Sequence, residues 1–315
     1  MTQDTGTGKY EQLLVRCGQM QPVTTAVVHP CEASALRGAV EAQEHGLIEP
    51  IYVGPAARIR EVAAEAGVDV GAAQVVDAPH SHGSAARAVE LVRLGQAELL
   101  MKGSLHTDEL LAAVVARESG LRTGRRISHA FVMDVPTYHK VLIVTDAAIN
   151  IAPTLEDKVD ICQNAIDLAR SLGVEQPKVA ILAAVDTVNS KMPATLDAAA
   201  LCKMAERGQI RGALLDGPLA FDNAISLDAA RTKGIDSKVA GDPDILLTPD
   251  LEAGNILAKL LTYLSKADSA GLVLGARVPI ILTSRADSVR ARIASCAVAM
   301  LATYARRGVP AQRAA

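Results

Sequence analysis

Short apolar runs alternate along the chain with longer segments in which apolar residues recur at helical spacing. The short runs are rich in Val, Ile and Leu, which is typical of strands that are buried on both faces of a parallel sheet. This strand, turn, helix order predicts βαβ units and an α/β fold with helices flanking the sheet. The predicted strands are Ile51–Val53, Glu98–Met101, Val141–Thr145, Val179–Ala183, Gly212–Leu215, Ile245–Thr248, Gly271–Leu274 and Pro279–Thr283.

Several of the predicted helices begin with residues whose side chains cap a helix N-terminus. Such caps are hydroxyl or carboxylate side chains that accept a hydrogen bond from the first free backbone N–H groups. The candidates are Thr107 or Asp108 before LLAAVVA, Thr154 with Asp157 before VDICQNAIDLA, and Asp287 or Ser288 before VRARIASCAVAML.

The length of the chain favours two lobes over one. At 315 residues it exceeds the size at which a single hydrophobic core usually keeps growing. No tandem repeat, low-complexity segment or long Pro/Gly linker marks a boundary. The polar and basic segment GLRTGRRISHA, residues 120–130, is the predicted crossing between the lobes.

Composition narrows the possible partners. Half of the residues are apolar, but there is no Trp and only two Phe and five Tyr, which argues against an aromatic platform for stacking bases. The net charge of −3, from 32 basic and 35 acidic side chains, gives no overall field that would attract nucleic acid. No apolar run reaches the roughly 18 to 20 residues that span a bilayer, and the polar start lacks a signal-peptide core. We therefore expect a cytoplasmic protein that binds neither nucleic acid nor membrane.

The spacing of the cysteines and histidines does not indicate a metal site or a covalent nucleophile. Five cysteines without CxxC spacing are predicted to be core thiols, and His80 and His82 lie too close together on a loop to suggest a zinc site. No GxSxG motif is present, and no Cys lies next to a His. Chemistry would therefore be direct transfer between two bound substrates, with no metal and no cofactor.

Polar groups cluster where predicted strands end, the edge at which open parallel sheets bind ligands. Ser284 and Arg285 follow the last predicted strand, and Lys102, Gly103 and Ser104 follow an earlier one. An arginine can hold two phosphate oxygens, and a glycine beside a lysine allows close backbone approach to a phosphate. The alternative for Arg285 and Lys102 is a solvated surface role.

The later strand ends carry carboxylates and amides. Asp216, Gly217 and Pro218 are predicted to form a turn directly after a strand, with Asp222 close behind. Asp222 could orient a ligand or cap the next helix. Asn255, in LLTPDLEAGNIL, has the same two interpretations.

Six ordered motifs together resemble the phosphate acetyltransferase/phosphate butyryltransferase family. They are KGSLHTDELL, VTDAAINIAP, AALCKMAERG, LLDGPLAFDNAI, PDILLTPDLEAGNIL and VPIILTSRADS, and the similarity runs from about Gln12 to Arg306. The similarity is greatest to butyryl-type members and to the phosphate acetyltransferase half of proteins that also carry an enoyl-CoA hydratase domain.

The resemblance implies reversible transfer of a short acyl group between coenzyme A and orthophosphate. It implies two α/β lobes, 1–124 with 271–315 and 125–270, with parallel or mixed sheets and an active cleft between them, as in isocitrate and isopropylmalate dehydrogenases. Ser284 falls on the serine linked to the CoA thiol and Arg285 on the arginine linked to phosphate. Lys102 and Gly103 fall on the family's KG motif, and Asp216, Gly217, Pro218 and Asp222 fall on its DG-x-L-x-x-D loop. The predicted substrate-binding residues are these six together with Ser104, His82, Arg122 and Asn255. The resemblance also implies that coenzyme A is a substrate and that the protein forms a homodimer or higher homo-oligomer.

The chain departs from acetyl-specific members at two places. Where they carry a carboxylate after the Ser-Arg pair, this chain has Arg290 and Ala291, and Thr262 or Tyr263 replaces an upstream arginine. Asp287 is then the nearest acid, either as a catalytic group or as a helix cap. Two rival functions remain: a two-lobed dehydrogenase that uses a metal and NAD, and a non-catalytic sensor of CoA or acyl phosphate.

Overall fold

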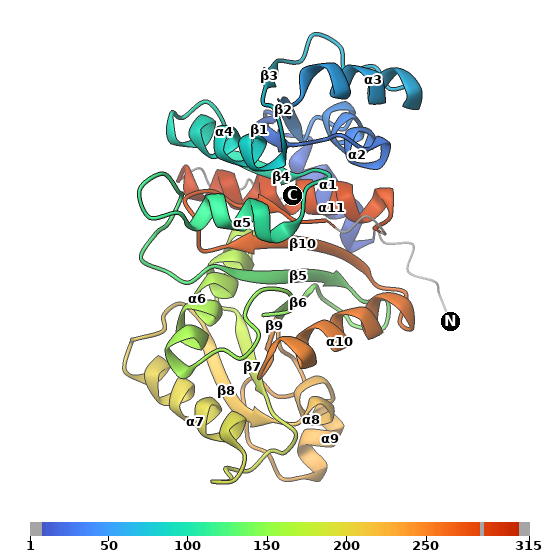
Figure 1. Ribbon diagram of the computed structural model, residues 1–315. Helices are drawn as coiled ribbons and strands as arrows, with labels where there is room; N and C mark the ends of the chain where they lie inside the picture. The colour runs from blue at the N-terminus through green and yellow to red at the C-terminus, as the bar shows by residue number, and fades with distance from the viewer. Residues whose placement is uncertain (1–7, 284–286, 309–315) are drawn as a thin grey trace, which may run out of the picture. The chain divides into compact units, whose positions relative to one another are not determined.

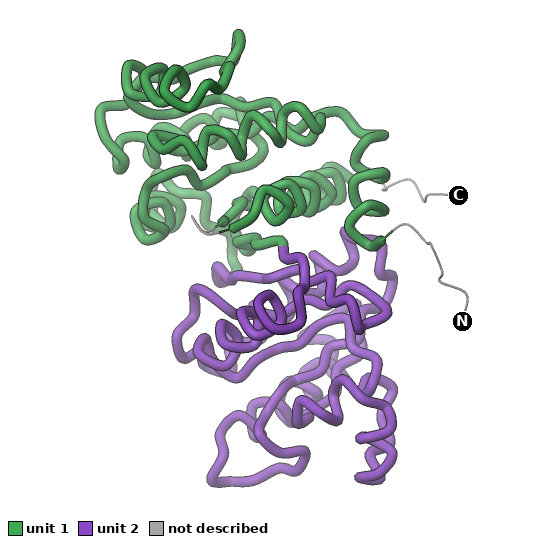
Figure 2. Tube along the Cα trace, turned by 90° about the vertical axis from the view of Figure 1, so that its right-hand side faces the viewer, with its two compact units in different colours: residues 1–125, 270–315 green, residues 126–269 purple. Residues whose placement is uncertain are grey.

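The structure is a computed structural model that describes residues 8–283 and 287–308. The chain divides into two compact units, residues 1–125 with 270–315 and residues 126–269 (Figure 2). Both units have a mixed α/β architecture in which helices flank the strands (Figure 1).

The first unit alternates strands and helices from its start. Its elements are α1 (Lys9–Cys17), β1 (Val23–Val28), α2 (Ala33–Glu44), β2 (Ile48–Gly54), α3 (Ala56–Ala66), β3 (Val75–Asp77), α4 (Ser81–Arg93), β4 (Leu99–Lys102), α5 (Thr107–Val115), β10 (Asp268–Leu274), β11 (Ile280–Ile281) and α11 (Val289–Arg306). The strand order is β3-β2-β1-β4-β11-β10, and only the β10–β11 pair is antiparallel. The carboxyl ends of β1, β2, β4 and β11 therefore lie at one edge.

Helix α11 forms the centre of this unit. It is buried continuously from Ala291 to Thr303 and packs against α1, α2 and β11. A helix that is buried on most of its faces is built mainly from apolar residues, which explains its run of alanine, valine, isoleucine and leucine. The buried hydroxyls of Ser295 and Thr303 are satisfied by donating to the carbonyls of Ala291 and Ala299 at 2.8 and 2.9 Å. The C-terminal segment is thereby part of the first unit's core.

The second unit contains five of the strands. Its elements are β5 (Ser128–Asp134), β6 (Leu142–Thr145), α6 (Leu155–Ser171), β7 (Lys178–Leu182), α7 (Pro193–Glu206), β8 (Leu214–Leu219), α8 (Phe221–Ile225), α9 (Leu227–Thr232), β9 (Ile245–Leu247) and α10 (Leu251–Tyr263). The order is β5-β6-β9-β7-β8, parallel except for the β5–β6 pair. Helices α6 and α10 pack against β6 over a core that includes Leu142, Val144 and Leu246.

Each predicted strand corresponds to an observed one, as β2, β4 and β6 to β11. Strands β1, β3 and β5 are not among the predicted strands. Two of these strands contain a buried polar residue that interrupts the apolar run, Thr25 in β1 and His129 in β5. The Thr25 hydroxyl is satisfied by donating to the carbonyl of Val23 at 2.8 Å.

The predicted helix caps are correct at α6 and at α11, where Ser288 is the N-cap, and shifted at α5. Thr154 caps α6, where its side chain accepts from the N–H of Asp157. Helix α5 begins one residue before the predicted caps: its N-cap is His106, and Glu109 supplies the reciprocal hydrogen bond to the His106 N–H. Glutamate performs this role because its longer side chain reaches back over the first turn.

The cysteines are free thiols, as expected of core residues. Cys17, Cys162 and Cys296 are buried, and Cys31 and Cys202 are half-buried. Burial raises the pKa of Cys162, Cys202 and Cys296 to about 12, so these side chains stay protonated at neutral pH.

Two kinds of feature are absent from residues 8–283 and 287–308. No helix in these ranges has the length and apolar character needed to cross a bilayer. No group of three or more His, Cys, Asp or Glu side chains there could hold a metal ion.

Candidate active site

The loop after β4 is anchored on the end of β1. The backbone N–H groups of Gly103 and Ser104 donate to the carbonyl oxygens of Val28 and His29, both at 2.9 Å. Lys102, the last residue of β4, is half-buried, and its Nζ donates to the carbonyl of Gly103 at 3.2 Å. The loop therefore carries a positive charge at the sheet edge where parallel strands end.

Gly103 is the point at which the two backbone segments approach most closely. A Cβ at this position would lie 2.3 Å from the carbonyl oxygen of Val28 and 2.7 Å from that of His29. Backbone atoms cannot rotate aside, so we expect Gly103→Ala to lower the free energy of unfolding by about 1–3 kcal/mol and to displace the loop.

Chemical denaturation measures this loss, and the KM for phosphate should rise with it. Gly124→Ala is the matched control, because a Cβ at Gly124 meets no atom within 4 Å. Equal stability of the two variants would show that the contact at Gly103 is not the constraint we infer.

His82 lies beside the same sheet edge, in the first turn of α4. Its Nδ1 is 3.4 Å from Oε1 of Glu109, which also accepts from the Ser81 hydroxyl at 3.1 Å. Burial opposes the charge of Glu109, but hydrogen bonds from His106 N–H and Ser81 and the neighbouring His82 hold its pKa below the ordinary value. The His82 side chain is 70% exposed, so it remains open to a ligand.

Ser284 and Arg285 lie outside the described residues. The strand that precedes them, β11, runs parallel to β4, with Ile281 paired to Met101. Helix α11 follows them in the sequence. Its N-cap is Ser288, whose hydroxyl oxygen accepts from the N–H of Ala291 at 3.1 Å. The capping alternative for Asp287 is therefore wrong, because the hydroxyl one residue later takes that position.

Arg122 is placed elsewhere in the first unit. It is exposed, and its backbone pairs with Ala276, which follows β10. Because β10 runs antiparallel to β11, Ala276 lies near the amino end of β11. The structure thus does not bring the backbone of Arg122 to the edge that carries Lys102.

In the second unit a buried carboxylate, Asp146, directly follows β6. It is 2% exposed and accepts from the backbone N–H groups of His129, Ala148 and Ile149 at 3.2, 2.9 and 3.0 Å and from Nδ2 of Asn150 at 2.5 Å. Asp146 is not among the site residues predicted from the sequence. Its position directly after a predicted strand is the signal that could have identified it.

Asn255 holds the same loop from the other side. It lies inside α10, where its Nδ2 donates to the carbonyl of Ala147 at 3.0 Å. The cap of α10 is Asp250, whose side chain accepts from the N–H of Ala253. The capping interpretation of Asn255 is therefore wrong, and its amide fixes the loop after β6.

Asp216, Gly217 and Pro218 lie within β8 and do not form the predicted turn after a strand. Two features allow a glycine and a proline there. The register between β7 and β8 shifts near Ala180, and β8 is the last strand in the order of its unit, where a missing N–H costs little. Gly217 is required, because a Cβ would lie 2.7 Å from the carbonyl oxygen of Ile181.

Asp222 is the second residue of α8, whose N-cap is Ala220, so its capping alternative is wrong as well. Its carboxylate lies 3.5 Å from Nζ of Lys233, which also pairs with Asp186 at 3.2 Å. Since β6, β7, β8 and β9 are parallel, Asp186, Asp222 and the Asp146 loop all follow carboxyl ends at one edge of this unit's sheet.

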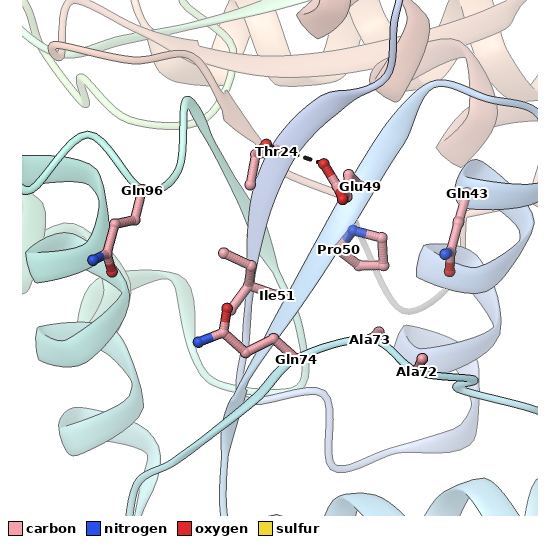
Figure 3. A pocket seen from close by; sticks show the side chains of 9 residues that line it. All are labelled: Thr24, Gln43, Glu49, Pro50, Ile51, Ala72, Ala73, Gln74 and Gln96. Atoms are coloured by element: carbon pink, nitrogen blue, oxygen red, sulfur yellow. Dashed lines mark hydrogen bonds between the residues drawn. The ribbon is translucent and has the colours of Figure 1, made fainter.

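A pocket of about 680 Å³ lies at the opposite edge of the first unit's sheet (Figure 3). Thr24 and Glu49, near the starts of β1 and β2, line it, and the Thr24 hydroxyl donates to Glu49 at 3.4 Å. Gln43, Gln74 and Gln96 surround them. The lining contains no cationic side chain, so this pocket does not suit a phosphate.

Comparisons with known proteins agree with the motifs. The family model described as Phosphate acetyl/butaryl transferase matches residues 81–300. A phosphate acetyltransferase from Rhizobium meliloti is 63% identical over 307 residues, covering 98% of this chain and 96% of that protein. A phosphate butyryltransferase from Clostridium acetobutylicum is 41% identical over 287 residues, covering 91% of this chain and 95% of that protein.

A solved structure supports the same assignment. The crystal structure of a branched-chain phosphotransacylase from Enterococcus faecalis V583 has a TM-score of 0.79 at 30% sequence identity, covering 90% of this chain and 99% of that one. These matches do not favour the dehydrogenase or sensor alternatives. The chain therefore belongs to the phosphate acetyl/butyryl transferase family and is an acyltransferase, as its motifs predict.

Proposed function

We propose that the protein transfers an acyl group reversibly between coenzyme A and orthophosphate, by direct transfer in a ternary complex. The observation that carries this proposal is the anchored loop Lys102–Ser104 beside β11, the strand that leads into Ser284 and Arg285. Family membership supports the two substrates, since the matching proteins are named for phosphate acyl transfer.

The proposed chemistry needs electrostatics and positioning, which this edge can supply. Phosphate and acyl phosphate are anions, and Arg285 with Lys102 would hold them against the acyl carbonyl. The tetrahedral oxyanion would be stabilised by the same positive charge. Ser284 would steer the CoA sulfur. We propose no cysteine as an acyl carrier, because burial raises the pKa of each described cysteine and opposes the thiolate form.

The remaining site residues stay proposals of the same kind. Asp216, Gly217, Pro218, Asp222 and Asn255 would orient substrate hydroxyls and amides, and His82 would add a donor. The role of Arg122 stays a prediction from the sequence, because its backbone lies away from the edge that carries Lys102. The functional lobes would be 1–124 with 271–315 and 125–270, and the dehydrogenase-like active cleft implied by the resemblance stays a prediction. We also propose that the protein uses no cofactor. We propose further that it forms a homodimer or higher homo-oligomer, and light scattering of the purified protein would measure its oligomeric state.

Initial-rate kinetics test the ternary complex. With acetyl phosphate and CoA varied together, direct transfer requires both substrates to be bound before any product leaves. Double-reciprocal plots should therefore intersect. Parallel lines, or phosphate release from acetyl phosphate before CoA is added, would indicate an acyl-enzyme and contradict the proposal.

A further inference from the structure

His29, at the end of β1, has an unusual backbone and a central position. Its φ of 55° lies in the left-handed region, which non-glycine residues rarely adopt. Residues held in this way cluster at functional sites, where the surrounding structure enforces the strain. Here the carbonyl of His29 accepts from Ser104, so the left-handed residue contacts the proposed phosphate loop directly.

Hydrogen bonds fix which imidazole nitrogen carries the proton. The Ser84 hydroxyl donates its single hydrogen to the carbonyl of His80 at 2.9 Å, and its oxygen lies 3.0 Å from Nδ1 of His29. The oxygen must therefore accept there, which places a hydrogen on Nδ1. Nε2 is left with its lone pair.

Nε2 is available for chemistry. No residue in the described ranges is a hydrogen-bond partner of Nε2, and it is not among their buried, unsatisfied polar atoms. Burial lowers the pKa of His29, an effect that Glu109 opposes and His80 reinforces. The ring is consequently neutral at pH 7, and it belongs to a residue whose backbone carbonyl accepts from the loop.

The sheet order places His29 near the end of β11. β4 separates β1 from β11, so the two strands are about 10 Å apart at a spacing of about 4.8 Å per strand. A side chain and the end of a substrate together span that distance. The Lys102–Ser104 loop lies at the end of the intervening strand.

We propose that Nε2 of His29 accepts the thiol proton of coenzyme A when CoA attacks an acyl phosphate. This inference rests on the proposed function and fills the role that Arg290 and Ala291 leave open. As the S–C bond forms, the thiol proton moves to Nε2. The C–O bond to phosphate then breaks with its electron pair on oxygen, and the imidazolium returns the proton to the departing phosphate. The reverse reaction uses the same steps in the opposite order.

His29→Asn tests the proposal with little change in shape. Asparagine tolerates a left-handed φ, and its Nδ2 can replace Nδ1 as donor to Ser84, but it has no equivalent of Nε2. With acetyl phosphate and CoA at pH 7 we expect kcat to fall about 100-fold, the usual scale for loss of a general base.

Two further readouts distinguish a base from a structural role. At pH 9 the thiol, with a pKa of about 8.5, is mostly ionised, so the deficit should shrink. Added imidazole should restore part of the rate at pH 7. Ser84→Ala, which leaves Nε2 in place and only frees the ring, should lose less activity than His29→Asn.

The matched control is His45→Asn, an exposed histidine of the same unit whose Nδ1 contacts the carbonyl of Glu41 at 2.8 Å. Its activity should equal that of the unaltered protein. Full activity of His29→Asn, or a deficit that is unchanged at pH 9 and by imidazole, would overturn the role of His29 alone. Absence of transfer in both the unaltered protein and the His45 variant would overturn the proposed function, and this inference with it.

Discussion

Replacing Arg285 with alanine should lower kcat by about 10²- to 10³-fold while the fold stays intact. Removal of one group that stabilises developing charge in a transition state typically has an effect of this size. Arg285 is the cation that we propose binds the phosphate. It comes after β11 in the sequence, and β11 pairs with β4, which ends at Lys102. Steady-state assays with acetyl phosphate and CoA measure the loss, and circular dichroism with thermal unfolding shows whether the protein is folded.

Two variants sharpen this experiment. Arg285→Lys keeps the charge but loses the planar fork that holds two oxygens, so it should recover only part of the rate. Arg93→Ala removes an exposed arginine from the last turn of α4 in the same unit and should leave activity unchanged. If Arg285→Ala were as active as Arg93→Ala, the phosphate would have to be held by other residues.

Replacing Asp146 with alanine should produce the largest loss of stability, about 3–4 kcal/mol. The carboxylate is 2% exposed and accepts from the N–H of His129 in β5, from the N–H groups of Ala148 and Ile149 in the loop, and from the Asn150 amide. Each buried donor left without a partner costs about 1–3 kcal/mol, and partial repair by water reduces the total. The shift of the urea unfolding midpoint measures the effect.

Asp228→Ala is the control for this loss, because the Asp228 side chain is 95% exposed. Its midpoint should not move measurably, as is usual for an isolated surface substitution. A similar midpoint for both variants would mean that the loop after β6 does not depend on the buried carboxylate. Asp146→Asn, which keeps one acceptor oxygen, should fall between the two.

The sequence predicts much of the fold because a strand buried on both faces must be a short apolar run. That rule finds β4, β6, β7 and β9. It fails at β1, where a buried threonine interrupts the run and is satisfied only by a backbone carbonyl. It also fails at the end of β8, since a Gly-Pro pair ordinarily indicates a turn, whereas an edge strand with a register shift accommodates it.

The candidate site is predictable where one residue type implies one geometry. The glycine after Lys102 was expected to allow close approach to a phosphate, which stays a prediction, and the structure shows that it also allows close approach to the carbonyl of Val28. Helix caps were harder, because neighbouring hydroxyls and carboxylates compete for one position, as Asp287 and Ser288 do before α11. His29 could not be predicted, since its tautomer depends on Ser84, 55 residues away in the sequence.

Thiol release from acyl-CoA tests the central claim most directly. The purified protein is incubated with acetyl-, propionyl- or butyryl-CoA, with and without orthophosphate, and free thiol is followed together with acyl phosphate. We expect release only when phosphate is present, in equal amount with acyl phosphate, and the rates rank the acyl chains. No release with any of the three, while CoA still binds, would contradict the assignment and leave a non-catalytic sensor.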